Sequence, residues 1–94
     1  MRLTKDDPCA CELRALLGQY FLFTRADLRL SQMEFADALS MDKRSYIDIE
    51  HRKSLCCSLT LLTYLCYYCK DSAAFLSDCR RILDKYAPPR RKLH

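Results

Sequence analysis

The sequence predicts an all-α domain of five helices. Half of the 94 residues are apolar and only one is glycine, a composition that favours helices with tight connections over a sheet of hairpins. Apolar residues recur at spacings of three and four along five segments, and capping residues stand before them. A chain of this length buries one modest core, so we expect a single domain over residues 8–87 and a basic tail over residues 88–94.

The first helix is expected over residues 8–29. Asp7 before Pro8 is a start signal, because Asp caps helices and proline has a helical φ without an N–H to satisfy. Gly18 lies inside this segment, and we favour a close approach of another helix there over a helix break. The residues expected on the inner face are Leu13, Leu16, Leu17, Tyr20, Phe21 and Leu28.

Two short helices should follow, over residues 32–39 and 43–50. Ser31 and Glu34 form a capping box, in which each side chain satisfies a backbone N–H of the other's turn. Asp42 is expected to cap the second of the two helices, which leaves only Ser40 and Met41 between them. The residues expected to face inward are Phe35, Ala36, Leu39, Tyr46 and Ile49.

The last two helices complete the predicted fold. We expect Ser58 to cap the fourth, and Asp71 or Ser72 to cap a fifth that runs roughly from residue 73 to 86, before Pro88 and Pro89. The inward-facing residues are expected to be Leu59, Leu62, Leu65, Cys66 and Cys69 in the fourth helix and Phe75, Leu76, Cys79, Ile82 and Leu83 in the fifth.

The stretch SQMEFADALSMDKRSYIDIE, residues 31–50, carries a resemblance to a known family. Two helices joined by so short a turn must cross steeply, as in DNA-binding helix-turn-helix motifs. The stretch resembles the Cro/C1-type helix-turn-helix family of small phage repressors and bacterial regulators, and the resemblance extends from about residue 18 to residue 69. The positions that agree with the family pattern are Arg25, Ser31, Gln32, Ala36, Leu39, Asp42 and Glu50.

The sequence departs from the family at two turns. The family usually has glycine between its second and third helices, where this chain has Ser40. After the glutamate that matches Glu50, the family favours Asn-Gly and then a proline, whereas His51 and Arg52 follow here. A residue other than glycine costs about 1–2 kcal/mol in a left-handed conformation. We therefore expect these departures to alter the turns more than the fold.

The resemblance implies sequence-specific binding to double-stranded DNA by a transcriptional regulator of a bacterium or mobile element, with helix 43–50 in the major groove. It implies a phosphate contact for Gln32, and a buried structural ion pair between Arg25 and Glu50. It places Lys43, Arg44 and Asp48 on the base-reading face. Their chemistry fits, because Arg and Lys donate to guanine O6 and N7 and Asp accepts from cytosine N4. The alternative is a solvated face on which Lys43 pairs with Asp48.

Other residues near this helix extend the expected DNA-binding set. Asp42 stands at the start of the helix, and Ile47 could meet a thymine methyl group or belong to a protein interface. Arg52 and Lys53 in the following loop are natural phosphate contacts, and residues 43–53 hold four bases against two acids. A second basic cluster either reaches the DNA backbone or serves as a solubilising end; it comprises Arg80, Arg81, Lys85, Arg90, Arg91 and Lys92.

The seven cysteines do not indicate a disulfide framework or a metal site. Their number is odd, and residues 1–9 lack the apolar core of an export signal, so we expect reduced thiols in a cytoplasmic protein. Cys66 and Cys69 form a CxxC, but it lies in an apolar helical run without a second such pair, and burial is the favoured explanation. A metal or redox role for His51, Cys56 and Cys57 is less favoured.

The sequence carries no motif for catalysis, a cofactor or a small-molecule ligand, and its longest apolar run is too short to cross a bilayer. We therefore expect neither an enzyme nor a membrane protein. Because one helix-turn-helix reads few base pairs, we expect a homodimer. Its surface should include Tyr64, Tyr67, Tyr68 and Phe75, unless these rings cover the first helix within one chain. The rival to DNA binding is a protein-interaction module, either an antitoxin-like partner or a scaffold.

Overall fold

The chain forms five α-helices and no strand over residues 7–86, the part that this computed structural model describes. The helices are α1 Pro8–Leu28, α2 Gln32–Ala38, α3 Lys43–Glu50, α4 Ser58–Tyr67 and α5 Ser72–Tyr86. The predicted all-α class is confirmed, and the predicted helix bounds differ by single residues. Residue 87 and the expected basic tail at residues 88–94 lie outside the described residues.

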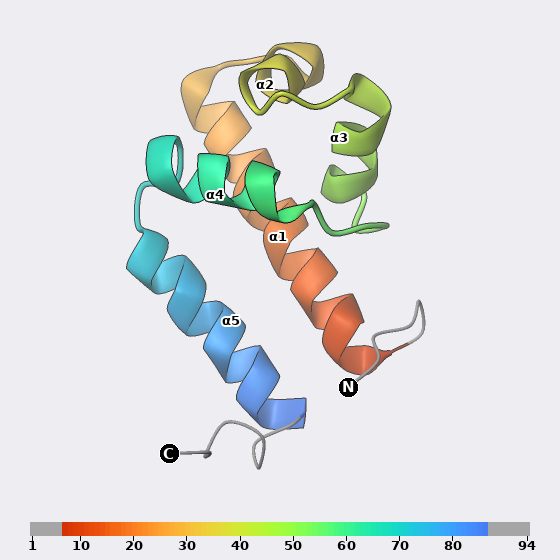
Figure 1. The fold of residues 1–94 in the computed structure, drawn as a ribbon, viewed down its shortest axis with the longest axis vertical. Coiled ribbons are helices and arrows are strands. Elements are labelled where there is room, and N and C mark those ends of the chain that lie inside the picture. The colour runs from red at the N-terminus through yellow and green to blue at the C-terminus, as the bar shows by residue number, and fades with distance from the viewer. Residues whose placement is uncertain (1–6, 87–94) are drawn as a thin grey trace.

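α1 is the central element of the fold (Figure 1). It packs against α3 and α5, and α2 packs against α3. α4 crosses α1, and α5 runs back beside α1 in the opposite direction. In the view of Figure 1, α2 is seen nearly end-on whereas α3 runs down the page, so these two short helices cross steeply.

Most of the helix starts are capped as the sequence predicts. Asp7 Oδ1 accepts from the backbone N–H groups of Cys9 and Ala10, at 2.8 and 3.2 Å. Ser31 and Glu34 form the full capping box. At the start of α5, Asp71 Oδ1 accepts from the backbone N–H of Ala74 at 2.9 Å, so Asp71 is the cap rather than Ser72.

The start of α4 differs from the prediction. Cys57 is its N-cap, and Ser58, the expected cap, is already the first helical residue. This first turn has no side-chain hydrogen bond of the kind that a serine N-cap would make. The Cys57 Sγ instead lies 3.4 Å from the hydroxyl of Thr60.

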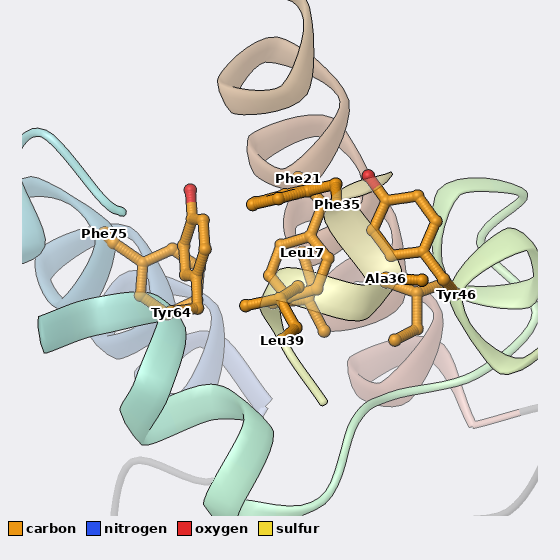
Figure 2. Packing of buried hydrophobic residues seen from close by; sticks show 9 residues of the cluster. Leu17, Phe21, Phe35, Ala36, Leu39, Tyr46, Tyr64 and Phe75 are labelled. Atoms are coloured by element: carbon orange, nitrogen blue, oxygen red, sulfur yellow. The ribbon is translucent and has the colours of Figure 1, made fainter. Parts of the chain in front are cut away.

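An aromatic cluster forms the centre of the core (Figure 2). The ring of Phe21 in α1 lies 4.5 Å from that of Tyr64 in α4 and 6.0 Å from those of Phe35 in α2 and Tyr46 in α3, measured between centroids. Phe75 of α5 lies 4.9 Å from the ring of Tyr20 in α1 and 6.3 Å from that of Tyr64. Four helices therefore meet around one residue of α1, and α5 is attached at the edge.

The predicted inner face of α4 is wrong for three of its five residues, and of the five only Leu65 and Cys69 are partly buried. Leu59 and Leu62 are 72% and 59% exposed, and Cys66 is exposed as well, whereas Thr60 and Tyr64 are buried. The buried polar atoms have partners, because the Tyr64 hydroxyl lies 2.8 Å from the Thr24 hydroxyl and donates to the Tyr20 carbonyl. Both faces of this helix are apolar, and the buried one carries Tyr64, whose ring packs on Phe21 and whose hydroxyl is bonded to α1. The partly buried residues of the helix and the turn after it are Leu61, Leu65, Tyr68 and Cys69.

Several other inward assignments change. Leu28 and Leu76 are exposed rather than buried. Tyr64 and Phe75 are buried in the core, so they cannot form the expected dimer surface. Of the four residues assigned to that surface, Tyr67 alone is fully on the outside, at 80% exposure. The alternative, in which these rings cover α1 within one chain, is correct for Tyr64 and Phe75.

Gly18 marks a close approach of α1 to α3, as expected. A Cβ atom at this position would lie 2.6 Å from the carbonyl oxygen of Ile49, which is closer than real side chains come. The main chain at the end of α3 therefore occupies the space that a side chain at residue 18 would need. This contact sets the position of α3 on α1.

The turns that end α2 and α3 share one conformation. Ser40 has φ 58° and Arg52 has φ 64°, both in the left-handed region. After α2, the backbone N–H groups of Ser40 and Met41 donate to Asp37 and Ala36, which is the hydrogen-bond pattern of a Schellman motif. Arg52 and Lys53 make the same pattern with Ile49 and Asp48. Both departures from the family's glycines thus keep the backbone geometry that glycine favours.

Candidate nucleic-acid interface

The start of α3 is fixed by a local cap. Asp42 Oδ2 accepts from the backbone N–H of Ser45 at 3.0 Å, and its Oδ1 accepts from the Ser45 hydroxyl at 2.8 Å. These bonds hold the pKa of the Asp42 carboxyl below its ordinary value, because they favour the charged form. Both oxygens of Asp42 are thus engaged in holding the helix start, and any DNA contact by Asp42 would share its carboxylate with this cap.

The other end of α3 is held from behind by Arg25. Its Nε lies 2.6 Å from Glu50 Oε2, its Nη2 lies 3.2 Å from Glu50 Oε1, and its Nη1 donates to the Leu30 carbonyl. The side chain of Glu50 is only 5% exposed. The pair therefore joins α1 to the last residue of α3 and to the segment before α2.

Two further donors converge on Glu50. The Tyr46 hydroxyl donates to Oε2, and Gln32 Nε2 donates to Oε1 at 3.1 Å. Burial opposes ionisation of Glu50, but the hydrogen bonds from Arg25, Tyr46 and Gln32 outweigh it, so the pKa of Glu50 lies below its ordinary value. Burial and the bond to this carboxylate raise the pKa of Tyr46.

Sequence reasoning missed the roles of Tyr46 and Gln32 in this network. Tyr46 stands four residues before Glu50 on one helix, a spacing that brings side chains together, so this contact had a readable signal. Gln32 was assigned to a phosphate contact, and its amide is bonded to Glu50. The contact of Gln32 with a phosphate stays a prediction. One N–H of the Gln32 amide is already bonded to Glu50, so the other N–H would have to make that contact.

The predicted base-reading residues lie at different depths. Lys43 and Arg44 are exposed in the first turn of α3, whereas Ile47 and Asp48 are half-buried. The residues described include no ion pair between Lys43 and Asp48, the pairing that the solvated alternative would use. Asp48 also lines a groove of about 540 Å³ that α3 forms with residues 54–60. The exposed charge on α3 is therefore positive and is concentrated at its N-terminal turn.

Arg52 and Lys53 extend this positive surface beyond α3. Both are exposed, in the turn that directly follows the helix. The stem of Arg52 lies beside Gly18, where its Cγ would be 3.5 Å from an added Cβ. Lys43, Arg44, Arg52 and Lys53 thus lie at the two ends of one short helix, which the contacts of Glu50 and Gly18 fix on α1.

The cysteines form no cluster with acids or histidines. None of the seven is in a disulfide, and over residues 7–86 no group of three or more His, Cys, Asp or Glu side chains is placed to hold a metal ion. Cys66 is exposed, so its expected burial is wrong, and Cys69 is half-buried. Cys56 is half-buried with a raised pKa because of that burial, whereas bonds from Thr60 lower the pKa of Cys57.

Comparison of the chain with models of protein families, with curated proteins and with solved structures finds no match. Of the helices described, none combines the length and the apolar character needed to cross a membrane.

Proposed function

We propose that this chain binds double-stranded DNA sequence-specifically through a Cro/C1-type helix-turn-helix made of α2, the turn at Ser40 and α3. It acts as a transcriptional regulator of a bacterium or mobile element, in the cytoplasm, as a homodimer and without cofactor or enzymatic activity. The single observation that carries the proposal is the exposed pair Lys43 and Arg44 at the start of an α3 that is anchored to α1. A recognition helix needs this combination, because its N-terminal residues reach base edges.

The shape of the two turns also supports the proposal. Ser40 and Arg52 stand where the Cro/C1 family commonly has glycine, and both have the left-handed φ that glycine adopts easily. Arg29, which ends α1, has the same conformation at φ 57°, so the support comes from the two positions at which Ser40 and Arg52 stand and not from rarity alone. Together with the Arg25–Glu50 pair, the turns match the geometry that the family resemblance implies.

A DNA titration tests the proposal. Each phosphate neutralised by Lys or Arg releases condensed counterions. The affinity for a mixed-sequence duplex should therefore fall as the salt concentration rises, with a slope of log affinity against log salt of about −0.9 per contact. Replacing Lys43 and Arg44 together by Ala should weaken this binding more than the matched change of Arg80 and Arg81, which lie on α5. Selection of bound sequences from a random duplex pool should then yield a consensus. Absence of binding even at low salt would contradict the proposal.

The second candidate function is a protein-interaction module. The observation that favours it is the pair Ile47 and Asp48, which places an apolar and an acidic side chain beside Arg44 on the face that should meet DNA. A failed DNA titration by a folded chain would support this candidate. Retention of a specific partner protein by wild type, and its loss on Ile47→Asp, would then identify α3 as the contact surface.

A further inference from the structure

The outer face of α4 is unusual for the surface of a small protein. Residues 54–69 form the longest stretch of the sequence without a charged residue, sixteen in all. The inner face of α4 is buried through Thr60 and Tyr64, and on the opposite side lie the exposed residues Leu59, Leu62 and Cys66. Their spacings of three and four place them in one row along the helix. We call these three residues the α4 stripe.

Neighbouring apolar groups extend the α4 stripe. Leu55 precedes it at 43% exposure, and Tyr67 lies beside its C-terminal end. Isolated exposed leucines are common on protein surfaces, but a contiguous row with an adjacent tyrosine is typical of an interaction surface. Tyrosine suits such a surface, because its ring is apolar and its hydroxyl tolerates water.

We propose that the α4 stripe is a homodimer interface, in which it packs against the same stripe of a second copy of this chain. A two-fold interface places each patch against its own copy, so the residues nearest the axis meet themselves, and a charged group there would face a like charge. α4 contains no Asp, Glu, Lys or Arg, so its outer face meets this condition. The tyrosine surface expected from the sequence does not, because Tyr64 and Phe75 are in the core.

The size of the surface determines how strong the dimer is. A helix of ten residues is about 15 Å long, and a typical stable interface buries about 800 Å² on each partner. The α4 stripe with Leu55 and Tyr67 offers less than that. The free chain therefore associates weakly, in a concentration-dependent manner.

The location of the interface has a consequence that rests on the proposed DNA binding. Only seven residues separate the end of α3 from the start of α4. A two-fold axis at α4 therefore fixes the separation of the two α3 helices, and with it the spacing of the half-sites that they contact. A duplex with two suitably spaced half-sites should strengthen the dimer.

Sedimentation velocity across a concentration series, on the reduced full chain, tests the interface. The wild-type mass should rise from monomer towards dimer. Leu62→Asp should weaken association at least about tenfold, because the dimer would bury one new charge from each copy at the centre of the α4 stripe. Phe23→Asp is the matched control, because Phe23 is 58% exposed on α1 and lies outside α4. It should leave the association unchanged, and circular dichroism should show both variants folded.

A second measurement depends on proximity rather than on affinity. Leu62 is the middle residue of the α4 stripe, so near a two-fold axis it lies close to its own copy. In a chain whose exposed Cys11, Cys57 and Cys66 are replaced by Ser, Leu62→Cys should form an intermolecular disulfide on mild oxidation. Phe23→Cys in the same background should do so at least about tenfold more slowly.

The outcomes separate the interface from the proposed DNA binding. A chain that stays monomeric at every concentration, or association that Leu62→Asp leaves intact, would overturn the α4 interface. Equal losses from Leu62→Asp and Phe23→Asp would overturn it as well. Binding of a monomer to a duplex with one half-site would still support DNA recognition in each of these cases. If the chain passes both interface tests but binds no duplex, the α4 interface is supported and the proposed DNA binding is contradicted.

Discussion

Arg25 Nε lies 2.6 Å from Glu50 Oε2, and this contact joins the last turn of α1 to the final residue of α3. Gln32 and Tyr46 donate to the same carboxylate. One nearly buried side chain therefore ties together three helices, α1, α2 and α3. The orientation of α3, and so of the proposed DNA-contacting residues, depends on this carboxylate remaining charged and bonded.

Arg25→Met should lower the free energy of unfolding by about 3 kcal/mol. Removing one partner of a buried pair leaves an uncompensated charge, which costs about 3–5 kcal/mol. The lower end applies because Tyr46 and Gln32 still donate to Glu50. Urea unfolding followed by circular dichroism measures the change. Lys70→Met is the control, because it breaks the exposed pair of Lys70 with Asp27 and should cost less than about 1 kcal/mol. Equal losses would contradict the structural role of Arg25.

The network should also make stability depend on pH. The pKa of Glu50 is lowered in the folded state, so its charged form stabilises the fold above the ordinary value of 4.5. This contribution should decline as the pH falls from 4.5 through the lowered pKa. The difference in free energy of unfolding between wild type and Glu50→Gln, measured by urea titration at a series of pH values, should therefore shrink below pH 4.5. A difference that stays constant with pH would speak against this coupling.

Gly18→Ala should destabilise the fold although alanine favours helices. The gain in helix propensity is about 1 kcal/mol, but the new Cβ would lie 2.6 Å from the Ile49 carbonyl oxygen. Backbone cannot move aside as a flexible side chain can, and overpacking costs about 1–3 kcal/mol. Thermal unfolding should show a lower midpoint for Gly18→Ala and little change for Gln19→Ala, at the exposed neighbouring position. A higher midpoint for Gly18→Ala would mean that α3 is not held against residue 18.

Ser40→Gly should raise the free energy of unfolding by up to about 1 kcal/mol. Ser40 has φ 58°, where a side chain costs about 1–2 kcal/mol, and the greater freedom of glycine in the unfolded chain offsets part of the gain. Ala38→Gly, at the last residue of α2, has no left-handed φ to relieve and should instead lower it by up to about 1 kcal/mol. Chemical denaturation of both variants tests the assignment, and the same sign for both would contradict the left-handed turn.

Arg44→Ala and Lys53→Ala should affect DNA binding differently if α3 reads bases. Loss of Arg44 should relax the preference at one base pair by roughly 1–3 kcal/mol, whereas loss of Lys53 should weaken all sequences alike and reduce the salt slope by about one unit. Binding to the selected consensus and to its single-base variants at several salt concentrations measures both effects. Equal, sequence-independent losses would remove Arg44 from the base-reading role.

The sequence predicted those parts of the fold that depend on neighbouring residues. Asp7, Asp42 and the box of Ser31 and Glu34 act within one turn of a helix, so their capping roles could be read directly. The contact of Arg25 with Glu50 spans 25 residues and was anticipated only through the family resemblance. Long-range contacts of this kind leave no local pattern in a single sequence.

The face of α4 could not be read from its apolar pattern. Leu59, Leu62 and Cys66 make as regular a stripe as the residues that are buried. The buried face has its partners in another helix: the Tyr64 ring packs on Phe21, and its hydroxyl contacts Thr24 and the Tyr20 carbonyl, all in α1. The spacing of apolar residues within one helix does not report on its neighbours. In α4, which is apolar on both sides, this spacing predicted the wrong side as buried.

The attachment of α5 has a consequence for local opening of the protein. α5 contributes one fully buried side chain, Phe75, and its Cys79 is half-buried against the core. Two of its links to α1 are polar, the bond from the Tyr20 hydroxyl to Asp78 and that from Lys85 to Glu12. Few buried apolar contacts mean a small free energy of local unfolding. The backbone amides of α5 should therefore exchange hydrogen with solvent before those around Phe21 in α1, and a protease should cut first within α5 while α1 to α4 remain folded.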